Sequence, residues 1–168
     1  MSKKTRKLAL CALFSALAYI LLLIASIWPT GQLGFVAAAS LFVAAAVIEA
    51  GAVPALYVFI VSAALSLLLT PGRSPPMLFI SFFGFYPIVK SLIERLRGVV
   101  LQWALKLLVF NISLTVVWYI FNEWVYDFSS LNIHIVLVYL GGSAVFVLFD
   151  YGFTKAIWFY INRISRRK

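Results

Sequence analysis

The sequence predicts an all-α fold: a polytopic membrane protein with six transmembrane helices in a single domain, residues 1–168. Of the 168 residues, 64% are hydrophobic and only 11% are charged, whereas soluble domains average about 45–50% apolar and about 25% charged residues. The apolar residues fall into runs long enough for membrane helices, separated by short clusters of proline, glycine and charged residues. No polar stretch is long enough to form a separate soluble domain.

The first predicted span, residues 8–28, directly follows a basic segment, residues 3–7, which holds four lysines and arginines. The span carries no charge, and about 20 apolar residues allow a helix to cross a hydrocarbon core of about 30 Å. We expect a membrane helix rather than a cleaved signal peptide, whose apolar core has about 7–15 residues. The A-x-A match at 16–18 also lies in the middle of the apolar run.

The next three predicted spans are residues 33–48, 52–69 and 77–96. The first of these is short for a complete crossing, so a tilted or partly re-entrant segment stays open. A loop is expected at 70–76, because this stretch contains three prolines and a glycine. Within the fourth span, Pro87 is expected to kink the helix because proline removes a backbone hydrogen bond.

The last two predicted spans are residues 99–121 and 133–161, joined by a loop at 122–132 and followed by a basic tail. With six spans, both termini face the same side of the membrane. Eleven of the 14 lysines and arginines then fall on that side, two lie within spans, and Arg73 faces the other side. The positive-inside rule therefore predicts cytoplasmic termini.

The sequence lacks the residue patterns of the common catalytic sites. His134 is the only histidine and Cys11 the only cysteine, so we expect no metal site and no internal disulfide. There is no GxSxG motif, and no P-loop with which the chain itself would hydrolyse ATP. We therefore expect neither an enzyme nor a cofactor. The net charge of +9 is explained by topology and anionic lipid headgroups rather than by a nucleic-acid partner.

Small residues recur at helical spacing in the first predicted span. Ala12 and Ala16 form a small-xxx-small pattern, which lets a second helix approach the backbone closely in lipid. Two interpretations are open. The pattern serves packing within this chain, or it forms a docking surface for a partner protein.

Lys106 and Asp150 are charged residues inside predicted spans, in the halves predicted to face the cytoplasm. A charge within the bilayer is costly and normally faces a partner or a cavity. We therefore expect these two residues to form a buried interhelical ion pair, with Lys155 as a competing partner for Asp150. Such a pair is either structural or part of a proton-coupling site. Lys90 and Glu94 are four residues apart, so they can form a weak pair on one helical face.

A set of polar and aromatic residues lies near the predicted outer ends of the spans and in the outer loops. Such a mixture suits a pocket for a small molecule, although aromatic residues at a membrane interface also form an ordinary belt. The candidate ligand-binding residues are Trp28, Gln32, Asn111, Trp118, Glu123, Trp124, Asp127 and His134.

The whole pattern resembles the substrate-binding S components of energy-coupling factor (ECF) vitamin transporters. The resemblance rests on the basic N-terminus, the alanine-spaced first span with Ala12 and Ala16, the break at 29–31, and six spans ending in a basic tail. Together with the small size of the chain, it implies a protein of the bacterial cytoplasmic membrane. It further implies a subunit that binds a vitamin-like solute near the outer face. It also implies that Ala12 and Ala16 dock on a transmembrane coupling protein, while two cytoplasmic ATPases drive uptake.

Two other functions stay open. A structural scaffold, such as the small MreD-like component of a cell-shape complex, would bind protein partners through its helix faces and take no small solute. A self-sufficient carrier would use Asp150 and Lys106 in proton coupling and would need no ATPase.

Overall fold

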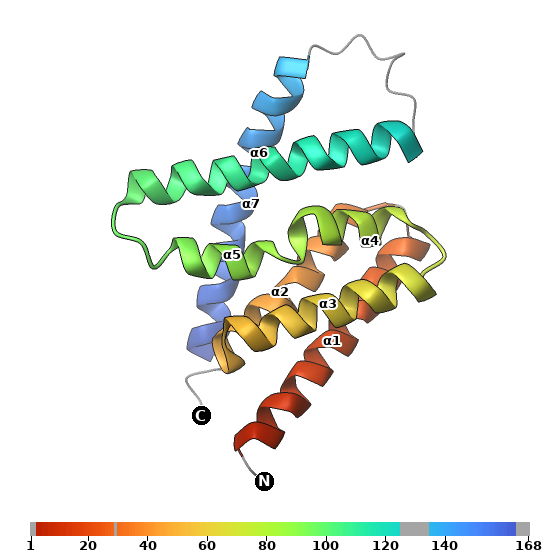
Figure 1. Cartoon of the computed structure of the whole chain (residues 1–168), viewed down its shortest axis with the longest axis vertical. Coiled ribbons are helices and arrows are strands. Elements are labelled where there is room, and N and C mark those ends of the chain that lie inside the picture. The colour runs from red at the N-terminus through yellow and green to blue at the C-terminus, as the bar shows by residue number, and fades with distance from the viewer. Residues whose placement is uncertain (1–2, 29, 125–134, 164–168) are drawn as a thin grey trace.

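The computed structural model describes residues 3–28, 30–124 and 135–163 (Figure 1). These residues form helices and no strand, and six helical spans among them are long and apolar enough to cross a membrane. The all-α prediction is therefore confirmed. In chain order the elements are α1 (Lys3–Ile27), α2 (Gln32–Ala50), α3 (Ala52–Leu69), α4 (Ser74–Leu78), η1 (Phe79–Phe83), α5 (Tyr86–Ile93), α6 (Val99–Trp124) and α7 (Ile135–Arg163).

The first three helices pack together through small residues. Ala18 and Ala25 of α1, Ala39 and Ala46 of α2, and Ala55 of α3 are completely buried, so the helix backbones approach closely. Serines in the same core donate to carbonyl groups of their own helices, which removes the cost of a buried unpaired hydroxyl.

The second span is a complete helix of 19 residues, Gln32–Ala50, two residues longer at its C-terminal end than the predicted 33–48. Its length and hydropathy suffice for a membrane crossing, so the structure favours neither a re-entrant nor a truncated segment. Gly51 alone separates α2 from α3. Its φ of 104° lies in a region that side chains with a Cβ rarely adopt, so glycine allows this one-residue reversal.

The fourth span differs most from its prediction. It runs over Ser74–Ile93 rather than 77–96, and it is divided into α4, the π-helical turn η1, and α5. The start is earlier because prolines fit the first turn of a helix, where their missing N–H has no partner to lose. Pro87 does not kink the middle of a helix. It occupies the first turn of α5, and the break at 84–85 precedes it.

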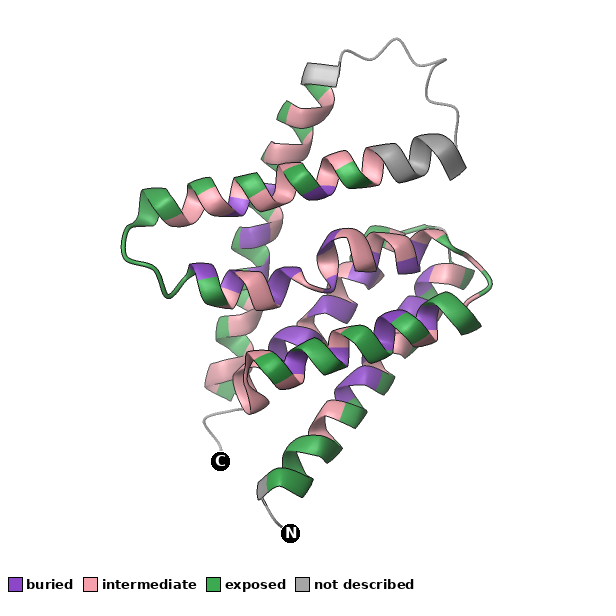
Figure 2. Cartoon of the chain, in the orientation of Figure 1, coloured by how far each residue is buried: buried purple, intermediate pink, exposed green. Residues whose placement is uncertain are grey.

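The last two helices also differ from the prediction at their boundaries. Helix α6 continues to Trp124, so Glu123 and Trp124 lie in its last turn and not in the predicted loop. Helix α7 begins at Ile135 and ends at Arg163, and it crosses the other elements at a marked angle (Figure 1). Both helices expose apolar side chains such as Val100 and Leu148, the distribution expected for lipid-facing surfaces. Figure 2 shows buried residues concentrated between the helices.

The connections gather at two ends of the molecule. At the first, which we call the Gln32 end, Ser26 in the last turn of α1 is hydrogen-bonded to Gly72 before α4, and Gln32 to Ser74. At the second, the Glu94 end, Lys7 approaches the Ala50 carbonyl at 3.5 Å. Tyr160 of α7 approaches Glu49 at 3.5 Å at this same end. The first four spans thus alternate between the two ends.

Candidate functional site

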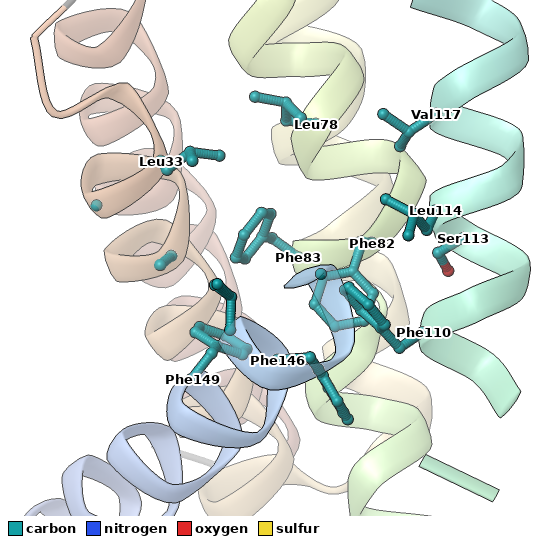
Figure 3. A pocket seen from close by; sticks show the side chains of 14 residues that line it. Leu33, Leu78, Phe82, Phe83, Phe110, Ser113, Leu114, Val117, Phe146 and Phe149 are labelled. Carbon is teal, nitrogen blue, oxygen red and sulfur yellow. The ribbon is translucent and has the colours of Figure 1, made fainter. Parts of the chain in front are cut away.

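A cavity of about 470 Å³ lies between α2, the fourth span, α6 and α7 (Figure 3). Leu33 and Phe83 point into the space between α2 and the fourth span, and Phe82, Phe110 and Phe146 gather on the opposite side. All four walls contribute side chains. The lining consists of Leu33, Gly34, Ala37, Leu78, Phe82, Phe83, Phe110, Ser113, Leu114, Val117, Gly142, Val145, Phe146 and Phe149.

The cavity wall is almost entirely apolar. Ser113 carries the single side-chain hydroxyl among the lining residues, and that hydroxyl donates to the Val109 carbonyl at 2.9 Å. The Phe110 and Phe146 rings are stacked, with centroids 4.6 Å apart. Such a wall recognises a molecule through shape and apolar contact, because it presents no charge and no free hydrogen-bonding group.

Polar groups stand beside the cavity at the Gln32 end. Gln32 precedes Leu33 of the lining, and its Oε1 accepts a hydrogen bond of 2.8 Å from Ser74 Oγ. Its Nε2 donates to the Ala25 carbonyl at 3.2 Å. Ser74 is one helical turn before Leu78, which also lines the cavity. The two side chains therefore place a polar rim near one end of an apolar chamber.

At its other end the cavity is floored by aromatic rings. Phe82, Phe146 and Phe149 line the cavity and also surround the ring of Tyr86. The Tyr86 centroid lies 4.8 Å from that of Phe82 and 5.5 Å from that of Phe146. Tyr86 is completely buried. Its ring therefore belongs to the aromatic layer, while its hydroxyl emerges on the far side.

Beneath this layer, Asp150 joins a network of charged side chains. Its Oδ1 accepts hydrogen bonds from Tyr86 Oη and Lys90 Nζ, each at 2.5 Å, and its Oδ2 lies 3.0 Å from Lys106 Nζ. Glu94 Oε1 lies 2.8 Å from Lys90 Nζ and 2.7 Å from Lys106 Nζ. Each cation thus contacts both anions. We call Lys90, Glu94, Lys106 and Asp150 the ion cluster.

The ion cluster is electrically balanced, with two cations and two anions. Lys90, Lys106 and Asp150 are buried, whereas the Glu94 side chain is 41% exposed. Burial raises the pKa of the Glu94 carboxyl, but hydrogen bonds from Lys106 and Lys90 outweigh burial and hold its pKa below the ordinary value. In the described part of the chain, every buried side-chain nitrogen and oxygen has a hydrogen-bond partner. The network is therefore fully satisfied.

The predicted contact between Lys106 and Asp150 is present, but it is one edge of a larger network. Sequence reasoning missed Tyr86, and it treated Lys90 and Glu94 as a weak local pair. The available signal was spacing: these three residues recur every four positions, so they share one helical face. The predicted competitor Lys155 does not reach Asp150. It is exposed and lies over the Tyr151 ring, 5.5 Å from the centroid.

The predicted ligand-binding residues do not line the cavity where the structure describes their side chains. Trp28 is exposed, and the Asn111 amide donates to the Leu107 carbonyl of its own helix at 2.8 Å. Trp118 is partly buried outside the lining, and Gln32 stands at the rim. Asp127 and His134 lie outside the described residues, as do the side chains of Glu123 and Trp124. The described members of the predicted set therefore lie outside the lining of this apolar cavity.

Ala12 and Ala16 lie on the exposed side of α1. The buried side of the same helix carries Ser15, Ala18 and Leu22. The two alanines therefore take no part in the packing of this chain, and they leave a shallow surface open to another molecule.

Comparison of the chain with protein-family models, with curated proteins and with solved structures gave no match.

Proposed function

We propose that this protein is a membrane subunit that binds a small solute for uptake and relies on partner ATPases for energy. The observation that carries the proposal is the cavity of about 470 Å³ between α2, the fourth span, α6 and α7. Its volume falls within the range of about 300–1,000 Å³ that is typical of small-molecule sites.

The solute proposed for this site is amphipathic, with an apolar body and one polar end. The apolar wall suits the body, because transfer of apolar surface out of water is favourable. A wholly apolar molecule would enter the bilayer unaided, so a binding protein is useful for a molecule whose polar part resists that transfer. Gln32 and Ser74 at the rim supply hydrogen-bonding groups for the polar end.

The energy source proposed for uptake lies outside this chain, because the sequence contains no P-loop. Ala12 and Ala16 supply a surface on which a transmembrane coupling protein would dock, since both are exposed on α1. The ATPases would act from the cytoplasmic side.

The orientation proposed for the chain places the Glu94 end in the cytoplasm. Cations flank that end at the start of α1, and Arg95, Arg97 and Arg163 lie near the ends of α5 and α7. Arg73 lies at the Gln32 end. This distribution supports cytoplasmic termini through the positive-inside rule, and it places the cavity rim toward the outside.

The proposal is tested with two leucine substitutions at glycines that have open space around them. A Cβ at Gly34, which lines the cavity, meets nothing within 4 Å, and the same holds at Gly141, which does not line it. The purified protein is screened in detergent against vitamins and other small amphiphiles by thermal shift, because a ligand of the folded state raises its stability. Gly34→Leu should abolish the shift that a bound compound causes, whereas Gly141→Leu should retain it.

The same screen separates binding from a scaffold role. If no compound shifts the wild-type transition, and native mass spectrometry finds no small molecule bound to protein from mild detergent, the binding proposal fails. An MreD-like scaffold would then account better for the exposed face of α1. A shift that survives Gly34→Leu would place the ligand outside this cavity.

A further inference from the structure

A second, smaller crevice approaches the cavity from the Glu94 end. It has a volume of about 90 Å³. Pro87, Lys90 and Ser91 of the fourth span line its wall, together with Glu94 directly after that span. Helices α2 and α7 complete the wall with Ala44, Val47, Ile48 and Ile157. This crevice therefore reaches the ion cluster from the side opposite the cavity.

The barrier between the two spaces is thin along the fourth span. Phe83 lines the cavity and Pro87 lines the crevice. Only four positions separate these two residues in the chain, and the break at 84–85 lies between them. Tyr86 stands between them, with its ring against the cavity floor and its hydroxyl on Asp150. One aromatic layer and the ion cluster separate the cavity from the crevice.

The fourth span is interrupted at this same barrier. The Gly84 N–H bonds to the Phe79 carbonyl, five residues back, at 2.7 Å, and regular α-helix resumes only at Tyr86. Wide π-helical turns occur frequently at functional sites, and interrupted membrane helices commonly form the substrate sites of transporters. The break provides a place where α5 can rotate relative to α4 without unfolding either segment.

The ion cluster holds three elements together below the break. Lys90 lies in α5 and Glu94 directly follows that helix, whereas Lys106 belongs to α6 and Asp150 to α7. Rotation of α5 would separate Tyr86 and Lys90 from Asp150. The contacts are numerous but non-covalent, and Glu94 is already half exposed to the crevice side. Opening at this level would require these contacts to separate together.

We propose that Tyr86 and the ion cluster form a gate, with the break at 84–85 as its hinge, so that the chain itself passes solute from the cavity to the Glu94 end. This inference rests on the proposed function, because the cavity must hold a solute for passage to matter. It goes further, since it assigns translocation to this chain rather than to its partners. The solute is the amphipathic molecule proposed above. Its polar end would contact the charged groups of the ion cluster during passage.

The gate is tested by the accessibility of single cysteines. Cys11 is the only cysteine in the sequence, so Cys11→Ala gives a protein without cysteine, into which single cysteines can be introduced. Ser113→Cys then reports on the cavity and Ser91→Cys on the crevice. Reconstituted vesicles are treated on each side in turn with a membrane-impermeant cationic methanethiosulfonate. The side from which Ser91→Cys reacts faster defines the Glu94 side, whatever the orientation of the chain.

Tyr86→Phe is the gate variant, because it keeps the aromatic layer and removes only the hydrogen bond to Asp150. We expect it to raise the labelling rate of Ser113→Cys from the Glu94 side about tenfold, since one hydrogen bond to a charged group is worth roughly that factor in a two-state equilibrium. Tyr139→Phe is the matched control. It removes a hydroxyl contact of 2.6 Å between α7 and α6, to Thr115, and should leave the rate unchanged.

An unchanged rate in Tyr86→Phe would overturn the gate, and so would an equal increase in Tyr139→Phe, which would indicate general loosening. Both variants are first shown to be folded and to unfold cooperatively in detergent. The thermal-shift screen with Gly34→Leu reads solute binding independently. Binding by the wild-type protein without gated labelling would therefore refute this inference alone, whereas absence of any binding by the wild-type protein would refute the proposed function.

Discussion

At the scale of single residues, the ion cluster shows how charged side chains are accommodated inside an apolar bundle. Burial of an ion is expensive unless it is paired and its remaining hydrogen-bonding positions are filled. Lys90 achieves this with Asp150, Glu94 and the Thr154 hydroxyl at 3.0 Å. The cost of removing one member therefore exceeds the value of any single contact, because the remaining charges stay buried.

Asp150→Asn should destabilise the protein strongly. Breaking a buried ion pair by removing one partner typically costs about 3–5 kcal/mol, and here both Lys90 and Lys106 lose a partner. Reversible unfolding in mixed micelles measures the change in free energy. Lys155→Met on the same helix is the control, since Lys155 is exposed and outside the cluster, and it should change stability by less than about 0.5 kcal/mol. Equal effects of the two substitutions would contradict the assigned network.

The lowered pKa of Glu94 predicts how the stability of the fold changes in acid. Its pKa is lowered in the folded protein by Lys106 and Lys90, so its stabilising contribution is complete above its ordinary pKa of about 4.3. That contribution is lost as the pH falls through the lowered folded value. Unfolding measured between neutral pH and acid should therefore show a smaller acid-induced loss in Glu94→Gln than in wild type. Identical pH profiles of the two proteins would show that the Glu94 carboxylate does not stabilise the fold.

At the scale of elements, the sequence predicts where helices lie better than it predicts their internal geometry. Long apolar runs between proline and glycine clusters locate all six spans, because the bilayer requires that length. The π-helical turn at Phe79–Phe83 was not predictable from local pattern. It depends on the approach of another helix, since Gly84 faces the Phe59 ring of α3. Pro87 was a misleading signal because proline is equally compatible with the first turn of a helix.

Gly84→Ala should destabilise the fourth span. A Cβ there would lie 2.5 Å from Phe59 Cδ2 and 2.8 Å from Phe79 Cε1, closer than two carbon atoms can pack. The Phe59 ring would have to move, at a cost of about 1–3 kcal/mol, the usual cost of overpacking. Gly141→Ala is the matched control in α7, where a Cβ meets nothing within 4 Å. It should raise stability by up to about 1 kcal/mol, because alanine is the better helix former. Unfolding in mixed micelles compares the two, and a stabilising Gly84→Ala would contradict the close packing at the break.

At the scale of the whole molecule, the membrane class was predictable and the candidate site was not. Composition and hydropathy indicate a membrane protein, because soluble and membrane chains differ over their full length. The cavity is lined by leucine, valine and phenylalanine, and these residue types also cover lipid-facing surfaces. Only the packing of α2, the fourth span, α6 and α7 distinguishes the two environments. Lys106 and Asp150 were found because charges inside a span are rare.

The orientation of the bundle can be measured directly. Cations concentrate at the Glu94 end, whereas Arg73 lies at the Gln32 end, so we expect the N-terminus in the cytoplasm. A cysteine at Thr30 in the Cys11→Ala background should react with an impermeant thiol reagent added outside intact cells, because Thr30 is exposed at the Gln32 end. A cysteine at Arg97, exposed at the Glu94 end, should react only after the cells are opened. The reverse pattern would invert the proposed path of the solute.

Because this face of α1 is exposed, substitutions on it should impair partner binding without impairing folding. Ala12→Trp and Ala16→Trp place a large ring on a surface that this chain does not use for its own packing, so unfolding should stay near the wild-type temperature. A helix that docks closely on this face would be pushed away, because small-xxx-small contacts leave no room for such a ring. Purification from mild detergent should then lose a coupling protein and its ATPases. Leu68→Trp on α3, where the side chain is 80% exposed, should retain them. Retention of the same partners by all three variants would exclude this face of α1 as the docking surface.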